Sequence, residues 1–395
     1  MIYRKVLLIF AGIVTLTLYS CNDNPTSVGS NLLKNDFINV NQADSYKDSL
    51  KQSSSFYKNT IPLGESSTLL LGKNANVQSS VLMRFLLYFD DSVKTDYSNN
   101  KVSIISAKVN LTPTSPTYTF GDSTAPFNFS VYSVTSNWTS AGFDSDSLSS
   151  LIYNTSNLSS NLQVTDSATS FDLNLSVVNN WMKEIIDSTF ADDNGIYLLP
   201  SADTKKVMGY MALSASYSLA TSLTLVLQKS GVYTDTLTFY PAQDISVISS
   251  TPPAGSNEDI FVQGGVVYNS KLWFDVSSVP KNSIINRAEL ILTVDSSSTI
   301  TGSNYNNSLY VYFLQDSTTN VFDTTRTYLL SNVSNTFDGN ITSYVQSWVD
   351  NSSNQGLLVQ VANTLGGLEL FALKGSNAAV RSVRPRLIIT YTSKK

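Results

Sequence analysis

Few residues of this chain are suited to catalysis. Histidine is absent, and a single cysteine, Cys21, occurs among 395 residues. Without histidine, Ser-His-Asp and Cys-His nucleophiles are excluded, and so are nearly all zinc sites. We therefore predict that the protein is not an enzyme. The alternative is a lyase that uses Tyr with Arg or Lys, because such chemistry needs no histidine.

The acidic residues are better suited to a cation than to acid–base chemistry. Four of them, Asp144, Asp146, Asp192 and Asp193, lie in polar, loop-like sequence. General acid catalysis of glycoside hydrolysis needs a carboxyl group whose pKa is raised by apolar surroundings, which this sequence lacks. Calcium prefers clustered oxygens, but the spacing is not that of an EF-hand. We expect no cofactor, with calcium as the alternative.

Aromatic side chains are the stronger candidates for binding, because the face of a pyranose ring stacks on Trp or Tyr. Tyr118 follows two prolines in a Thr/Ser/Pro-rich stretch, and Tyr305 lies in a Gly/Ser/Asn-rich one. Both compositions indicate loops. We predict these tyrosines to be exposed platforms for a polysaccharide, with ordinary surface tyrosines as the alternative.

The first residues predict export and lipid attachment. Arg4 and Lys5 precede an apolar stretch, Val6 to Leu18, that is too short to span a bilayer. We predict a signal peptide over residues 1–20. The stretch ends in Leu-Tyr-Ser-Cys, which resembles a bacterial lipobox, and its Cys21 is the only cysteine in the chain. We predict that acylation of Cys21 attaches the protein to a lipid bilayer, with an ordinary signal peptide or uncleaved anchor as the alternative.

The composition favours a β-rich extracellular protein. Charged residues make up 14% and hydrophobic residues 42%, with abundant Ser, Thr and Asn. The net charge of −5 and the lack of Lys/Arg runs argue against a nucleic-acid partner. One cysteine allows no intramolecular disulfide, so an exported fold depends on its core alone. Residues 21–51 are polar and predict a flexible tether.

Two short amphipathic helices stand out against strand-like sequence. Apolar residues recur at helical spacing from Ile341 to Trp348, after Asn340 as a candidate N-cap. An equivalent segment runs from Leu175 to Trp181 after Asn174. We predict that both tryptophans lie in the core, and expect the same of Trp138, which ends a strand.

Strand-like segments surround the two helices in the same order. The matched residues Phe85 and Phe274 are 189 positions apart, whereas the helix tryptophans are 167 apart. The first copy therefore has the longer loops. In this alignment Trp273 replaces Arg84, a position that accepts a polar head, so we predict Trp273 near the surface as a third ligand-binding residue.

The duplication predicts an all-β protein of two tandem jelly-roll-like β-sandwiches, each with one short helix. We predict the first module over residues 52–230 and the second over residues 231–395. Each half is long enough to bury its own core.

The succession L-x-R-F, I-x-x-A-x-L-x-L, V-x-x-W, G-L-x-L and P-R-L-x-V-x-Y resembles DNRLRE-type modules, a jelly-roll family grouped with carbohydrate-binding modules. The resemblance covers about residues 55–228 and 240–392. The second half fits better, through Trp348, Phe371 and Pro385-Arg386-Leu387. The first half lacks the Pro-Arg, and the name-giving hexapeptide is absent from both. The N-terminal part also resembles surface lipoproteins of Bacteroidota.

These resemblances imply a lipoprotein of the outer membrane or cell surface. The expected function is non-catalytic binding of polysaccharide or another envelope polymer. The alternative is a structural or assembly protein of the envelope whose modules serve as spacers.

The lipid anchor is testable by a single substitution. Cys21→Ala is expected to release the protein from the membrane fraction without unfolding it, because acyl chains on a polar tether have no partner in the fold. Fractionation followed by immunoblotting measures the release. Full membrane retention of the variant would rule out attachment through this residue.

Overall fold

The computed structural model describes residues 39–74, 76–165, 167–187, 194–216, 220–265, 268–350 and 352–393. Within these residues the fold is all-β, as predicted, with three short α-helices. In the described part of the chain, no helix is long and apolar enough to cross a membrane. Cys21, the predicted signal peptide and the start of the predicted tether lie outside these residues.

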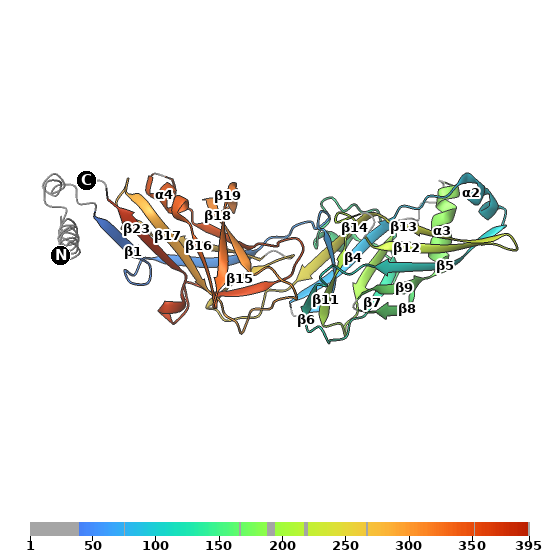
Figure 1. The fold of residues 1–395 in the computed structure, drawn as a ribbon, viewed down its shortest axis with the longest axis horizontal. Helices are drawn as coiled ribbons and strands as arrows, with labels where there is room; N and C mark the ends of the chain where they lie inside the picture. The colour runs from blue at the N-terminus through green and yellow to red at the C-terminus, as the bar shows by residue number, and fades with distance from the viewer. Residues whose placement is uncertain are drawn as a thin grey trace, which may run out of the picture.

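The first module spans residues 60–250 and contains a seven-stranded and a five-stranded antiparallel sheet (Figure 1). The strand orders are β6-β11-β3-β4-β10-β7, with β14 also on β4, and β13-β12-β5-β9-β8. Its elements are β3 (Thr68–Asn74), β4 (Val77–Phe85), α2 (Asp91–Ser98), β5 (Val102–Leu111), β6 (Thr119–Gly121), β7 (Phe129–Ser133), the 3₁₀ helix η1 (Ser147–Ser150), β8 (Ser159–Val164), β9 (Thr169–Leu173), α3 (Leu175–Ile186), β10 (Ile196–Pro200), β11 (Lys206–Met211), β12 (Ser222–Lys229), β13 (Tyr233–Phe239) and β14 (Pro241–Ser250).

The second module combines residues 39–58 with residues 256–393 in one curled 11-stranded sheet. The order is β1-β23-β17-β20-β19-β18-β21-β16-β15-β22, with β2 also on β16. Its elements are β1 (Val40–Asp44), β2 (Gln52–Lys58), β15 (Asp259–Gln263), β16 (Tyr268–Phe274), β17 (Ile284–Thr293), β18 (Ser308–Asp316), β19 (Val321–Val333), β20 (Thr336–Asn340), α4 (Thr342–Asp350), β21 (Leu357–Val361), β22 (Leu370–Lys374), the 3₁₀ helix η2 (Arg381–Val383) and β23 (Arg386–Thr392).

Strand pairing divides the chain differently from the predicted segmentation. β1 lies within the predicted tether, yet it pairs with β23 of the second module. β2, predicted to begin the first module, pairs with β16 of the second. The predicted boundary at residues 230 and 231 falls inside the β12–β13 hairpin, and β14 returns to pair with β4. The first module is thus inserted between β2 and β15. The sequence did not reveal this insertion, because backbone pairing between distant segments leaves no local signal.

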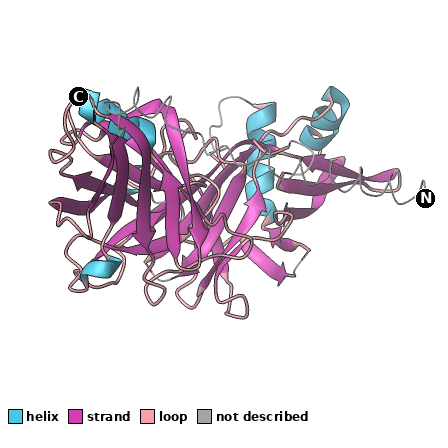
Figure 2. Ribbon diagram, turned by 60° about the vertical axis from the view of Figure 1, so that its left-hand side comes forward, coloured by secondary structure: helices cyan, strands magenta, loops and turns pink. Residues whose placement is uncertain are grey.

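The two predicted helices are confirmed as α3 and α4. Asn174 caps α3 by accepting the Ser176 N–H at 2.9 Å, and Asn340 Oδ1 accepts the Thr342 N–H at the start of α4. Trp181 and Trp348 are buried, as predicted. The helices are few and short in modules built mainly of strands (Figure 2). The first module also contains α2, which was not predicted.

The two modules share a hydrophobic cluster that lies outside their own cores. It joins Phe120 and Ile248 of the first module to Phe261 and Leu370 of the second. Tyr118 belongs to this cluster and is only 7% exposed. The modules lie end to end, with β1 and β23 at one extremity and α2 at the other (Figure 1). We infer that this shared cluster makes the two modules one elongated body.

The helix tryptophans provide a test of how independent the modules are. Trp348 stacks on Phe313 at 6.0 Å, and its loss should cost the second module about 3–5 kcal/mol. Limited proteolysis of Trp348→Ala should therefore remove residues 39–58 together with the C-terminal part, leaving a fragment of roughly residues 60–250. The products are identified by mass.

Trp348→Phe is the matched control for this substitution. Trp348 Nε1 has no hydrogen-bond partner among the described residues, so the smaller aromatic ring should largely preserve protection. Digestion of both modules of Trp348→Ala at one rate would contradict separate cores and show a single cooperative unit.

A buried carboxylate in β14 should make stability depend on pH. Asp244 is 4% exposed, and its Oδ2 accepts the Leu213 N–H at 2.7 Å. Burial raises the pKa of Asp244 from 3.8 to about 6. The native state therefore binds the proton more tightly than the unfolded chain does, and stability falls as pH rises from about 4 to about 6.

Asp244→Asn removes this titration but keeps an acceptor for Leu213. Relative to the wild type, the variant should gain up to ~3 kcal/mol of unfolding free energy between pH 4 and pH 8. Denaturant titrations at a series of pH values measure the difference. Asp122→Asn, at an exposed turn, should leave this pH dependence in place. If the unfolding free energies of Asp244→Asn and the wild type change with pH in parallel, burial does not raise the pKa of Asp244.

Candidate ligand-binding site

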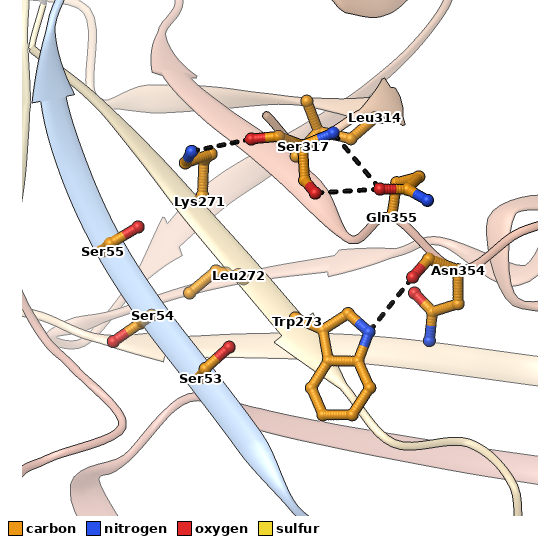
Figure 3. A pocket seen from close by; sticks show the side chains of 10 residues that line it. All are labelled: Ser53, Ser54, Ser55, Lys271, Leu272, Trp273, Leu314, Ser317, Asn354 and Gln355. Carbon is orange, nitrogen blue, oxygen red and sulfur yellow. Dashed lines mark hydrogen bonds between the residues drawn. The ribbon is translucent and has the colours of Figure 1, made fainter. Parts of the chain in front are cut away.

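An open pocket of about 350 Å³ lies on the second module, where β2 and β16 run beside the start of β21 (Figure 3). It combines an aromatic ring with hydroxyl and amide groups and has one charged side chain. The lining residues are Ser53, Ser54, Ser55, Lys271, Leu272, Trp273, Leu314, Ser317, Asn354 and Gln355.

Trp273 is the aromatic wall of this pocket. On β16 it alternates with Leu272 and Phe274, which lie in the core of the module, so the indole projects from the opposite face of the sheet. The indole N–H donates to the backbone oxygen of Asn354 at 3.1 Å and so fixes the ring. Trp273 is partly buried, in agreement with its predicted place near the surface.

The serines of β2 leave room beside the indole. Ser53 lies opposite Trp273 and Ser55 lies opposite Lys271 in the antiparallel ladder. Residues opposite each other in a ladder project from the same face, so both hydroxyls lie on the pocket side. A larger side chain at either position would fill the pocket. The short polar run therefore makes the site open and lines it with hydroxyl groups.

A turn over residues 316–320, here called the rim turn, borders the pocket. Lys271 Nζ donates to the Ser317 backbone oxygen and to Asn320 Oδ1, both at 3.0 Å. Gln355 Oε1 accepts the Ser317 hydroxyl at 2.9 Å. Asp316 Oδ1 accepts the Thr318 hydroxyl and N–H, and these bonds lower the pKa of Asp316. The rim turn is thus held in place before any ligand arrives.

The lining is suited to a polar ligand. Lys271 is the single charged residue among the ten, and none of them is a carboxylate. Glycoside hydrolysis by a pair of carboxyl groups would need such groups within reach of the reacting atoms. An indole face beside hydroxyl, amide and ammonium groups instead suits a polyhydroxylated ligand, with the ammonium favouring an anionic substituent.

The structure separates the three predicted ligand-binding residues. Trp273 lies in the pocket, whereas Tyr118 is buried between the modules and its phenol oxygen accepts the Leu368 N–H at 2.7 Å. The exposure predicted for Tyr118 is wrong, because its loop packs against the second module. Tyr305 is 38% exposed, and its ring lies 6.3 Å from that of Phe371.

Sequence reasoning missed Ser53, Ser55, Lys271 and Gln355 as members of one site. The segment from Ser53 to Tyr57 has no alternation of polar and apolar residues that would mark a strand, and its partner strand lies more than two hundred positions away. The site is assembled by pairing between distant segments, so no short motif marks it.

The structure describes two of the four acidic loop residues, Asp144 and Asp146. Asp144 Oδ1 accepts the N–H groups of Asp146 and Ser147, which makes it part of a local turn. Asp192 and Asp193 lie outside the described residues. Across the described ranges, no group of three or more metal-binding side chains is gathered in one place.

Comparisons with known proteins give limited similarity. A family model described as TGF-beta propeptide matches residues 246–387, less than half of the chain. A search of curated proteins found no match. Two solved structures of infectious bursal disease virus, its VP2 subviral particle and its Gx strain, share 8% and 10% identity with this chain. They cover 88% and 87% of it and 76% of their own chains, with TM-scores of 0.12 in both cases.

The role of Lys271 in holding the rim turn is testable. Lys271→Met should remove both hydrogen bonds to the turn, which cost about 1–3 kcal/mol when lost. Hydrogen exchange followed by mass spectrometry should show faster exchange of residues 316–320, with the rest of the module unchanged. Lys271→Arg, which keeps the donors and the charge, is the control. Unchanged exchange in Lys271→Met would mean that other contacts hold the turn.

Proposed function

We propose that this protein is a surface lipoprotein of the bacterial cell envelope that binds a polysaccharide or another envelope polymer without cleaving it. The observation that carries the proposal is the Trp273 pocket, where a fixed indole faces serine hydroxyls and one ammonium group. The sequence resemblance to DNRLRE-type modules supports the same ligand class. The absence of carboxylates from the lining supports a binding role.

The anchor in this proposal is acylated Cys21, at the outer membrane or cell surface. The first described strand, β1, starts at Val40, so the chain between Cys21 and β1 reaches the second module first. Because β1 and β23 lie at the extremity away from the first module, the second module would face the membrane and the first would project from it (Figure 1).

A structural or assembly spacer is the alternative function. The cluster shared by Phe120, Ile248, Phe261 and Leu370 favours it, because a buried interface prevents the modules from moving as separate bodies. A spacer needs this stiffness and no ligand. The two functions differ in whether a soluble ligand occupies the Trp273 pocket.

Trp273→Ala tests the binding function. A glycan array with the acylated protein in detergent identifies ligands, and calorimetry measures their affinity. Loss of the indole should weaken binding at least about tenfold, equivalent to about 1.4 kcal/mol. Tyr88→Ala, which removes an exposed aromatic ring of the first module, is the matched control and should bind as the wild type does.

Three outcomes would count against this proposal. An array without hits at high protein concentration would favour the spacer. Equal affinities of Trp273→Ala and the wild type would place the ligand elsewhere. Release of new reducing ends from any polysaccharide would show that the protein is an enzyme.

A further inference from the structure

Each module is completed by a pair of strands at the same structural position. In the first module β13 pairs with β12 and β14 pairs with β4. In the second module β1 pairs with β23 and β2 pairs with β16. The registers match, since Pro241 lies opposite Phe85 and Gln52 lies opposite Phe274.

The strand pairs belong to the sequence repeat. Gln52 and Pro241 are 189 positions apart, as are Phe85 and Phe274, the residues that they face. Each repeat therefore begins with a strand pair followed by a module body. However, β1–β2 precede the body of the first module and complete the second, while β13–β14 precede the body of the second and complete the first. The chain has exchanged equivalent elements between its two repeats.

The β1–β2 pair is held less firmly than its counterpart. None of the seven residues of β2 is buried, whereas β14 has five consecutive buried residues. The side-chain contacts of β1 and the following turn include Ala43 in the core, Leu50 at its edge and an ion pair between Asp44 and Arg386 at 2.6 Å. On β2 the ring of Phe56 lies 5.1 Å from that of Phe261, but Phe56 stays 36% exposed. Local opening of such an element costs less than unfolding the module.

Opening of β1–β2 would expose two template edges. β16 would lose a seven-residue ladder and β23 a five-residue one, leaving backbone groups unpaired. An exposed strand edge accepts another strand through main-chain hydrogen bonds, and side-chain fit then determines which strand is accepted. On β1–β2, three residues provide this fit. Ala43 packs in the core, Asp44 pairs with Arg386, and Ser54 hydrogen-bonds to Ser376.

We propose that the edges of β16 and β23 form a strand-acceptor site that takes the β1–β2 pair of a second copy of this chain. Every copy carries the donor that fits this site in register. Reciprocal exchange between two copies closes a dimer, and one-way exchange builds an open chain. The same exchange already occurs between the two repeats within one molecule.

Paired cysteines test the exchange in the full-length chain with Cys21→Ser, which removes the native thiol. Ser54 Oγ and Ser376 Oγ are 3.2 Å apart, so cysteines there are close enough for a disulfide. Ser54→Cys and Ser376→Cys are placed on separate copies of different mass, mixed at high concentration, cycled through mild denaturant and oxidised. We expect a disulfide-linked heterodimer at several times the yield of the control mixture, Ser55→Cys with Ser376→Cys.

Two results would overturn the acceptor site. One is a heterodimer yield no higher than the control while a chain carrying both Ser54→Cys and Ser376→Cys closes its own disulfide. The other is failure of that double variant to close, which would mean that β2 does not dock as described.

A charge exchange gives an independent readout. Asp44→Arg and Arg386→Asp each break the ion pair within a chain, but each variant restores it with the other. We expect each variant alone to remain monomeric and the equimolar mixture to yield heterodimers by light scattering. A mixture that stays monomeric would contradict the proposal.

Discussion

The structure depends on one constraint: in each module one strand, β4 in the first and β16 in the second, has an edge that must be paired with a further strand. β4 and β16 are equivalent strands. Without β14 and β2, each would have sheet neighbours on one side and an unpaired edge on the other. An unpaired edge exposes backbone donors and acceptors that promote association with other chains. The chain covers both edges with strands taken from the opposite repeat, β14 and β2. This arrangement forces the first module to lie as an insertion within the second.

The insertion adds to the contact that holds the two modules together. Two connections, before β3 and after β14, join them, and the shared cluster with Tyr118 fills the space between. Hydrogen bonds add direction to the apolar contact. Ser303 N–H donates to the Thr119 backbone oxygen at 2.7 Å, and Asn76 donates to Gln263 at 2.9 Å. A contact of this kind resists rotation of one module against the other.

Local sequence patterns predicted the all-β fold class but not how the strands connect. Helical spacing around Trp181 and Trp348, with an asparagine before each helix, located α3 and α4 correctly. β2 has no apolar face, since it lies on the outside of its module, and its polar run was assigned to the start of the wrong module. The predicted exposure of Tyr118 was wrong for a related reason. The composition of its loop indicates exposure, but contact between the two modules buries the side chain. The position of Trp273 near the surface could be predicted because the repeat aligns it with the charged residue Arg84. Ser53 and Ser55 could not be placed beside it, because they come from a strand more than two hundred positions away in the chain.

The pocket and the strand pair are physically linked. Ser53 and Ser55 come from β2, while Trp273 and Lys271 come from β16, so the pocket exists only when β2 is docked. A ligand that contacts both strands binds the docked state and not the open one, and it therefore stabilises docking by mass action. The coupling is reciprocal, because anything that holds β2 in place also raises the affinity of the pocket. The same argument applies whether β2 comes from its own chain or from a second copy, since the register that aligns Ser53 with Trp273 is the same in both.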